Sequence, residues 1–142
     1  MTRLDMSPAS NDSPTSPGTK GKLRIFMVEN HDDTRFLLCL LLEQLGHTVQ
    51  AVATVSEALD AAGSGAFDVL LSDIGLPDGN GWQLLTSLGD RAPPYAIAMS
   101  GFDMPSDRQQ SRAAGYRHHL SKPVEPDELE NLLDQAASEI GA

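Results

Sequence analysis

A few polar residues that could carry out phosphoryl chemistry each follow an apolar segment of the sequence, at the point where that segment ends. They are Glu29, Asn30, Asp73, Ser100 and Lys122. A carboxylate can attack a phosphoryl group and form an acyl phosphate. A lysine ammonium and a hydroxyl can stabilise the negative charge that develops during such a transfer. These residue types therefore predict phosphoryl-transfer chemistry, provided that the fold brings them together.

Each of these residues also has an ordinary structural interpretation. Glu29, with the nearby Asp32 and Asp33, is typical of a helix N-terminus, where acids interact favourably with the helix dipole. Asp73 precedes a segment rich in glycine, proline and asparagine and is typical of a turn. Ser100 and Lys122 are typical of a strand exit and of a solvated loop. The chemical interpretation depends on all of them meeting at one place.

The order of the predicted elements decides that question. Short apolar or β-branched segments predict strands at Leu23–Val28, Thr48–Ala53, Asp68–Ser72, Tyr95–Ser100 and Arg117–Leu120. Helices are predicted at Thr34–Leu45, from the capping box at Thr54 to near Gly63, at Gly81–Leu88, from a Ser106 cap to Gly115, and from Pro126 onward. The first helix has Phe36, Leu37, Leu40, Leu41 and Leu45 at helical spacing, and the last has Leu129, Leu132, Leu133, Ala136 and Ile140.

Strands that alternate with helices predict an α/β fold with a parallel sheet covered on both faces. We expect a flavodoxin-like, doubly wound five-stranded sheet in the order 2-1-3-4-5, with five helices. The carboxyl ends of its strands share one edge, so the acids, the hydroxyl and the ammonium converge there. Residues 1–22 are rich in Ser, Pro, Asp and Gly and predict a disordered tail before a domain at 23–142.

Composition excludes several classes of protein. The net charge is −10, with 20 acidic and 10 basic residues, which argues against a nucleic-acid partner. The single cysteine, Cys39, excludes an internal disulfide and lies in an apolar stretch, so we expect it to be buried. No secretory signal and no apolar run long enough to cross a membrane is present, so we expect a cytoplasmic protein with no membrane partner.

The motifs "LSDIGLPDGNGW", "AIAMSG" and "AAGYRHHLSKP", together with the acids after the first strand, resemble the receiver domain of bacterial two-component response regulators. The resemblance extends from about Leu23 to Ile140 and implies that Asp73 is the phosphoacceptor, assisted by Ser100 and Lys122. It also implies a cis Lys122–Pro123 bond.

By the same resemblance, Mg²⁺ is the cofactor, held by Glu29, Asn30, Asp73 and the backbone oxygen of Gly75. Two positions depart from the family pattern. Asn30 replaces the usual second acid, and His119 replaces the Tyr or Phe that moves inward on phosphorylation. His119 is therefore our candidate for a modified switch on the partner face.

We expect a regulatory phosphoacceptor rather than an enzyme that acts on other substrates. A histidine kinase or a histidine phosphotransfer protein would supply the phosphoryl group, and a downstream protein partner would recognise the result. The sequence ends soon after the last predicted helix, so we expect a single-domain receiver.

Three alternative functions compete with this interpretation. A degenerate receiver that acts as a phosphorylation-independent interaction module is suggested by Asn30 and His119. A haloacid-dehalogenase-like phosphatase is disfavoured because it needs an acid where this chain has Gly75. A flavin protein is disfavoured because it needs a phosphate-binding loop after the first strand, where this chain has "ENHDDTR".

Overall fold

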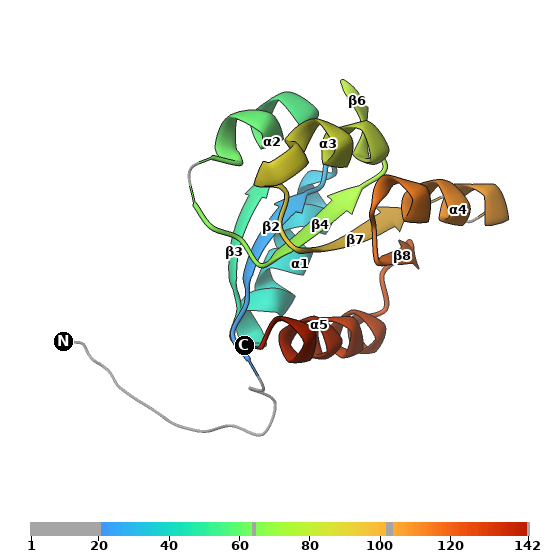
Figure 1. The fold of residues 1–142 in the computed structure, drawn as a ribbon. Helices are drawn as coiled ribbons and strands as arrows, with labels where there is room; N and C mark the ends of the chain where they lie inside the picture. The colour runs from blue at the N-terminus through green and yellow to red at the C-terminus, as the bar shows by residue number, and fades with distance from the viewer. Residues whose placement is uncertain (1–20, 64, 102–103, 142) are drawn as a thin grey trace.

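The computed structural model describes residues 21–63, 65–101 and 104–141 (Figure 1). Its main element is a parallel sheet of five strands, which lie in the order β3-β2-β4-β7-β8. The strands are β2 (Arg24–Val28), β3 (Thr48–Val52), β4 (Val69–Asp73), β7 (Tyr95–Ser100) and β8 (His118–Ser121). The helices are α1 (Asp32–Gln44), α2 (Val55–Ala61), α3 (Gly81–Leu88), α4 (Pro105–Ala114) and α5 (Pro126–Ile140), with a short 3₁₀ turn at Gly89–Arg91.

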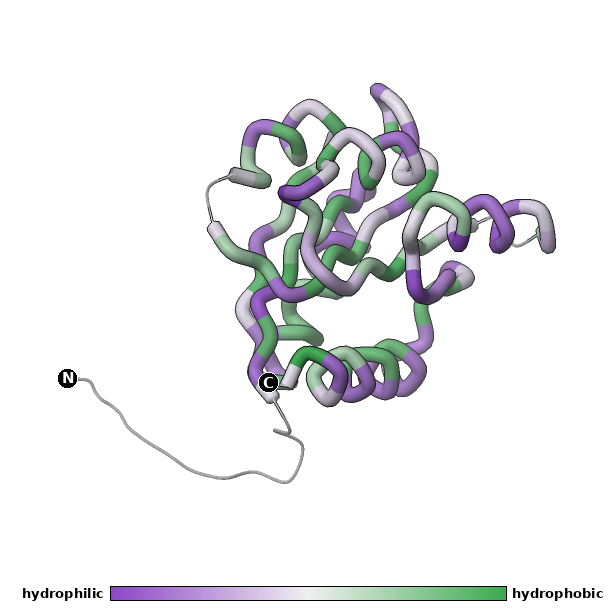
Figure 2. The backbone as a smooth tube through the Cα atoms, in the orientation of Figure 1, coloured by the Kyte–Doolittle hydropathy of each residue, from purple (hydrophilic) through white to green (hydrophobic). Residues whose placement is uncertain are grey.

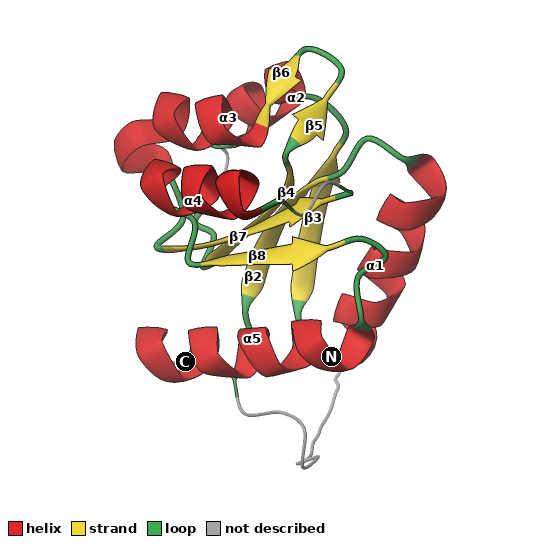
Figure 3. Ribbon diagram, turned by 90° about the vertical axis from the view of Figure 1, so that its right-hand side faces the viewer, coloured by secondary structure: helices red, strands yellow, loops and turns green. Residues whose placement is uncertain are grey.

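This arrangement confirms the predicted doubly wound order 2-1-3-4-5. One feature was not predicted: two-residue strands β5 (Gly75–Leu76) and β6 (Gly79–Asn80) pair antiparallel in the loop after β4. Figure 3 shows this hairpin projecting beyond the end of β4. It gives the loop a defined shape directly beside Asp73.

The sheet has two apolar faces because side chains on a strand alternate in direction. Ile25 and Met27 belong to the core that α1 and α5 cover, whereas Phe26 and Val28 belong to the core under α2 and α3. The central strands β4 and β7 are buried along their whole length, and Figure 2 shows the corresponding hydrophobic segments inside the molecule. Burying one such aliphatic side chain contributes about 1.5–3 kcal/mol to the stability of the fold. The buried sheet therefore supports the residues that follow its strands.

The predicted apolar face of α1 is wrong in part. Phe36, Leu37 and Leu40 are 64%, 62% and 42% exposed, and the helix instead buries Leu38 and Leu42. Nearly every position from 36 to 42 is apolar, so the periodicity of the sequence does not single out one face. Cys39 is half-buried rather than fully buried, and it packs against the α1–α5 core.

The predicted cap of α4 is also wrong. The N-cap is Met104, and Ser106 lies within the first turn. The Asp107 carboxylate accepts the Met104 N–H at 3.2 Å, which satisfies one of the free donors at the helix start without a polar N-cap side chain. Thr54 caps α2 as predicted, accepting the Glu57 N–H at 3.1 Å.

Two further predictions concern the whole chain. None of the helices in the described part of the chain combines the length and apolarity needed to cross a membrane. The predicted disordered tail at residues 1–22 lies almost wholly outside the described residues.

Candidate functional site

The carboxyl ends of the strands bring the predicted site residues to one edge of the sheet. Asp73 is the last residue of β4 and lies opposite Met99 of β7. Ser100 ends β7, lies opposite Ser121 of β8, and is buried at 5% exposure. Lys122 follows directly, and its N–H donates to the Ser100 carbonyl at 2.9 Å. Residues that are far apart in the sequence therefore meet at the carboxyl-terminal edge of the sheet.

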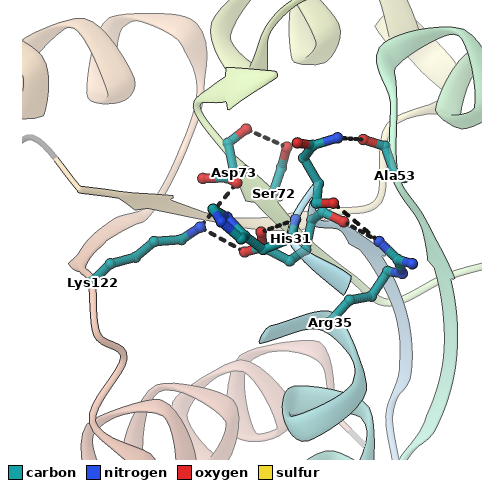
Figure 4. Close-up of polar contacts among 8 residues, drawn as sticks. His31, Arg35, Ala53, Ser72, Asp73 and Lys122 are labelled. Carbon is teal, nitrogen blue, oxygen red and sulfur yellow. Dashed lines mark hydrogen bonds and ion pairs between the residues drawn. The ribbon is translucent and has the colours of Figure 1, made fainter. Parts of the chain in front are cut away.

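Lys122 connects two buried carboxylates. Its ammonium nitrogen Nζ lies 2.9 Å from Asp73 Oδ2 and 2.7 Å from Glu29 Oε1 (Figure 4). Glu29 is fully buried and Asp73 is only 6% exposed. The Lys122–Pro123 peptide bond is cis, as the resemblance predicted. One ammonium therefore offsets two buried carboxylates.

The electrostatics of the site follow from this imbalance. Burial raises the pKa of the Asp73 carboxyl, Lys122 lowers it, and Glu29 raises it again, and the result is a pKa of about 6. Burial opposes the charge on Lys122, but its hydrogen bonds to Glu29 and Asp73 raise its pKa overall. At neutral pH, Asp73 is thus ionised but unusually basic for an aspartate.

The loop after β2 is held by contacts that the sequence analysis did not identify. Glu29 Oε2 accepts the His31 N–H at 2.9 Å, and the Arg35 guanidinium donates to the Glu29 carbonyl at 2.9 Å. Arg35 also pairs with Asp32 at 2.6 Å, within the first turns of α1 (Figure 4 shows Arg35 and His31). The spacing of Asp32 and Arg35 is a recognisable helical pair, so this part of the network had a signal in the sequence.

Gly81 fixes the loop that follows Asp73. Its N–H donates to the Ile74 carbonyl at 2.8 Å, and its own carbonyl accepts the Tyr116 hydroxyl at 2.7 Å. A Cβ atom on Gly81 would lie 2.5 Å from the Asp73 carbonyl oxygen, a distance that no side chain can adopt without movement. Glycine is therefore required here by close approach of the backbone. Neither Tyr116 nor this approach had a signal in the sequence.

Asn30 and Gly75, the other predicted metal-site residues, lie at the rim. Asn30 is exposed, and its side-chain amide donates a long hydrogen bond of 3.5 Å to the Ala53 carbonyl. Gly75 is exposed, and a Cβ atom there would meet nothing within 4 Å. The structure brings Glu29, Asp73 and Lys122 into direct contact, whereas the Asn30 amide is anchored towards β3.

The donor set fits a magnesium ion. Mg²⁺ in proteins usually takes one or two carboxylates and keeps several waters. Glu29 Oε1 is buried, with the Lys122 ammonium 2.7 Å away as its partner, and the raised pKa of Asp73 indicates that negative charge there is poorly compensated. No group of three or more His, Cys, Asp or Glu residues in the described ranges is placed to hold a metal. An ion here would thus depend on Glu29 and Asp73, with neutral oxygens completing its shell.

His119, the candidate switch residue, is buried at 8% exposure on the edge strand β8. Its ring nitrogen Nδ1 lies 2.8 Å from Ser111 Oγ of α4, and the same hydroxyl accepts the Trp82 indole N–H at 2.8 Å. The ring is therefore already directed inward, towards α4 and α3.

The comparison with protein families decides what kind of domain this is. The family model of the response regulator receiver domain matches residues 25–134. The chain belongs to the receiver domain family. This receiver domain is similar to solved structures of the same fold. It matches a two-component response regulator from Clostridium difficile with a TM-score of 0.81 at 19% identity, covering 85% of this chain and all of the other. It also matches a CheY-like receiver domain protein from Methanospirillum hungatei with a TM-score of 0.76 at 28% identity, covering 85% and 98% of the two chains.

Curated relatives of the receiver domain are of two sizes. An uncharacterized 14.6 kDa protein of Leptolyngbya boryana is 32% identical over 82% of this chain and 92% of its own length. The virulence sensor protein BvgS of Bordetella bronchiseptica is 31% identical over 92% of this chain, but the match covers only 11% of BvgS. The histidine-protein kinase BarA of Escherichia coli is 27% identical over 84% of this chain and 13% of its own length. The domain thus corresponds to nearly all of one relative and to a small part of the others.

Proposed function

We propose that this receiver domain is a Mg²⁺-dependent phosphoacceptor in which Asp73 takes a phosphoryl group from a histidine kinase or a histidine phosphotransfer protein. The observation that carries the proposal is the buried Asp73 carboxylate at the end of β4, with the Lys122 ammonium 2.9 Å away. The other strand-end groups, Glu29 and Ser100, lie at the same edge of the sheet.

The reaction needs an ionised carboxylate. With a pKa of about 6, Asp73 is ionised at neutral pH and is more basic than an ordinary aspartate. A carboxylate oxygen forms the new O–P bond while the N–P bond of the donor phosphohistidine breaks, and the donor imidazole keeps the electron pair of that bond. Mg²⁺ bound at Glu29 and Asp73 would supply positive charge to the transferring group. Lys122, already in contact with Asp73, offsets the charge that the product gains.

The switch follows from the position of Lys122. Lys122 lies three residues after His119 of β8, and His119 is coupled to α4 through Ser111. Phosphorylation adds a charge of about −1.5 to −2 and strong acceptor oxygens. We expect Ser100 and Lys122 to turn towards those oxygens, and β8 to repack against α4 and α5. A downstream protein partner that prefers one arrangement of this face then reads the state.

The surface beside the site supports a protein as phosphodonor. A groove of about 520 Å³ runs between α1 and the segment Lys122–Val124, and Leu37 lines it. Phe36 and Leu40 of the same helix are exposed as well. An apolar helix surface next to the acceptor suits a protein that must bring its phosphohistidine to Asp73. That two relatives are a sensor protein and a histidine-protein kinase agrees with such a donor.

The proposal is tested with a small-molecule donor. Incubation with acetyl phosphate and Mg²⁺ should add about 80 Da, the mass of one phosphoryl group, to the intact protein. Asp73→Asn should abolish the gain, and so should chelation of Mg²⁺. A wild-type chain that gains no mass would favour the alternative of a phosphorylation-independent interaction module, whereas an Asp73→Asn chain that gains as much as wild type would mean that another residue is the phosphoacceptor.

A further inference from the structure

A small basic pocket lies between α4, β8 and α5, on the face that the proposed switch would remodel. Its volume is about 200 Å³. Three of the chain's 10 Lys and Arg residues line it, namely Arg108, Arg112 and Arg117, but only one acid does, Glu128. The whole chain carries a net charge of −10, so this concentration of positive charge opposes the balance of the molecule. Such a pocket attracts anionic groups.

The three guanidinium groups are engaged to different degrees. Arg117 pairs with Glu139 and lies over the Tyr95 ring at 4.7 Å. Arg108 donates long hydrogen bonds, of 3.3 Å to the His119 carbonyl and 3.4 Å to Ser121 Oγ. The Arg112 guanidinium is exposed and makes no hydrogen bond or ion pair with any residue that the structure describes. Arg112 is thus the cation that an incoming anion would meet first.

His119 adds a buried polar atom to the same wall. Ser111 Oγ accepts the Trp82 indole N–H at 2.8 Å and lies 2.8 Å from His119 Nδ1. The other ring nitrogen, Nε2, is buried and has no hydrogen-bond partner among the described residues. A buried polar atom without a partner is unfavourable, and His119 is one of the residues that line the pocket.

We infer that this pocket binds a carboxylate side chain from an acidic segment of the downstream protein partner. Guanidinium groups form strong, charge-assisted hydrogen bonds with carboxylates, and the volume suits one side chain rather than a large ligand. Leu132 of α5 also lines the pocket and provides an apolar surface for the methylene groups of that side chain. The inference rests on the proposed function in one respect, since β8 links the pocket to Lys122 and so makes the affinity depend on phosphorylation.

The test uses a defined acidic peptide and its neutral isostere. Acetyl-Leu-Glu-Glu-Leu-Glu-Glu-amide and the matching Gln peptide are titrated into the ¹⁵N-labelled chain at low salt. The Glu peptide should produce saturable shifts of the Arg112 and His119 resonances, and the Gln peptide should bind about tenfold more weakly, as expected for loss of charge-assisted contacts. Arg112→Gln should weaken binding by a similar factor, because its guanidinium is exposed and its removal leaves the fold intact. Arg91→Gln, which removes an exposed cation outside the pocket, should change little.

Three results would overturn the inference: no saturable shift at the pocket, equal binding of both peptides, or an equal loss in Arg91→Gln and Arg112→Gln. The outcome is separable from that of the proposed function when the same preparation is tested with acetyl phosphate. If the chain is phosphorylated at Asp73 but does not bind the Glu peptide, the inference about the pocket alone is refuted. A chain that binds the peptide but gains no phosphoryl mass refutes the proposed function alone.

Discussion

Replacing Asp73 with asparagine should stabilise the metal-free domain, although it removes the proposed phosphoacceptor. Asn has nearly the same shape as Asp, can still accept a hydrogen bond from Lys122, and carries no charge. In the native site, the Asp73 carboxylate is buried and faces Glu29 across a single lysine. The charge is therefore less stable in the folded protein than in the unfolded chain.

The size of the expected gain in free energy of unfolding follows from the pKa of Asp73. An increase from 3.8 to about 6 corresponds to about 3 kcal/mol above pH 7, at about 1.36 kcal/mol for each pH unit. Water at the mouth of the site screens part of the repulsion, so we expect Asp73→Asn to gain about 2 kcal/mol in free energy of unfolding.

The sign of the pH dependence is fixed by the same shift. Between pH 4 and pH 6, about the two pKa values, the folded state binds more protons than the unfolded state, so the Asp73 contribution to stability falls as pH rises. The advantage of Asp73→Asn over wild type should therefore be small near pH 4, grow through this window and level off above about pH 7.

Urea unfolding in EDTA, followed by Trp82 fluorescence, measures the difference at both ends of the pH range. Asp90→Asn is a matched control, since Asp90 is exposed and belongs to the 3₁₀ turn at Gly89–Arg91, away from the site. The reasoning is refuted if Asp73→Asn is no more stable than wild type above pH 7, or if its advantage is the same at about pH 4.

Three other substitutions test the surroundings of Asp73. Gly81→Ala should lower the free energy of unfolding by about 2–3 kcal/mol, because its Cβ would lie 2.5 Å from the Asp73 carbonyl; Gly63→Ala, with nothing within 4 Å, is the control in the same urea experiment. Gly75→Leu should leave the fold unchanged and lengthen the lifetime of phosphorylated protein several-fold, by screening the acyl phosphate from water; an unchanged decay in the intact-mass time course would mean that water arrives elsewhere. Asn30→Asp should bind Mg²⁺ more tightly in a calorimetric titration and lower metal-free stability by about 1 kcal/mol through added repulsion; equal Mg²⁺ affinity would remove position 30 from the metal shell.

The strand-end residues were predictable because topology alone brings them together. Apolar segments that alternate with helices dictate a parallel sheet, and a parallel sheet places the residue after each strand at one edge. Lys122 and Asp73 are 49 residues apart, yet they lie in contact for this reason. The order of the strands and the direction of the chain were sufficient to predict that contact.

Features that depend on side-chain packing were not predictable in the same way. Phe36 and Leu37 are as apolar as Leu38, and only the packing of α1 against the sheet decides which of them is buried. The hydrogen bonds from Trp82 to Ser111 and from Ser111 to His119 join three separate elements, α3, α4 and β8. The approach of Gly81 to the Asp73 backbone depends on the hairpin in the intervening loop. Sequence spacing carries no information on such contacts.

The most direct test of the central claim is to locate the phosphoryl group chemically. An acyl phosphate on aspartate is reduced by borohydride to homoserine, whereas a free carboxylate is not. After acetyl phosphate and Mg²⁺ treatment, borohydride reduction and peptide mapping, we predict homoserine at position 73 and unchanged aspartate at Asp32, Asp33 and Asp78. Homoserine at another aspartate, or unmodified Asp73 in protein that has gained phosphoryl mass, would contradict the assignment of Asp73 as the phosphoacceptor.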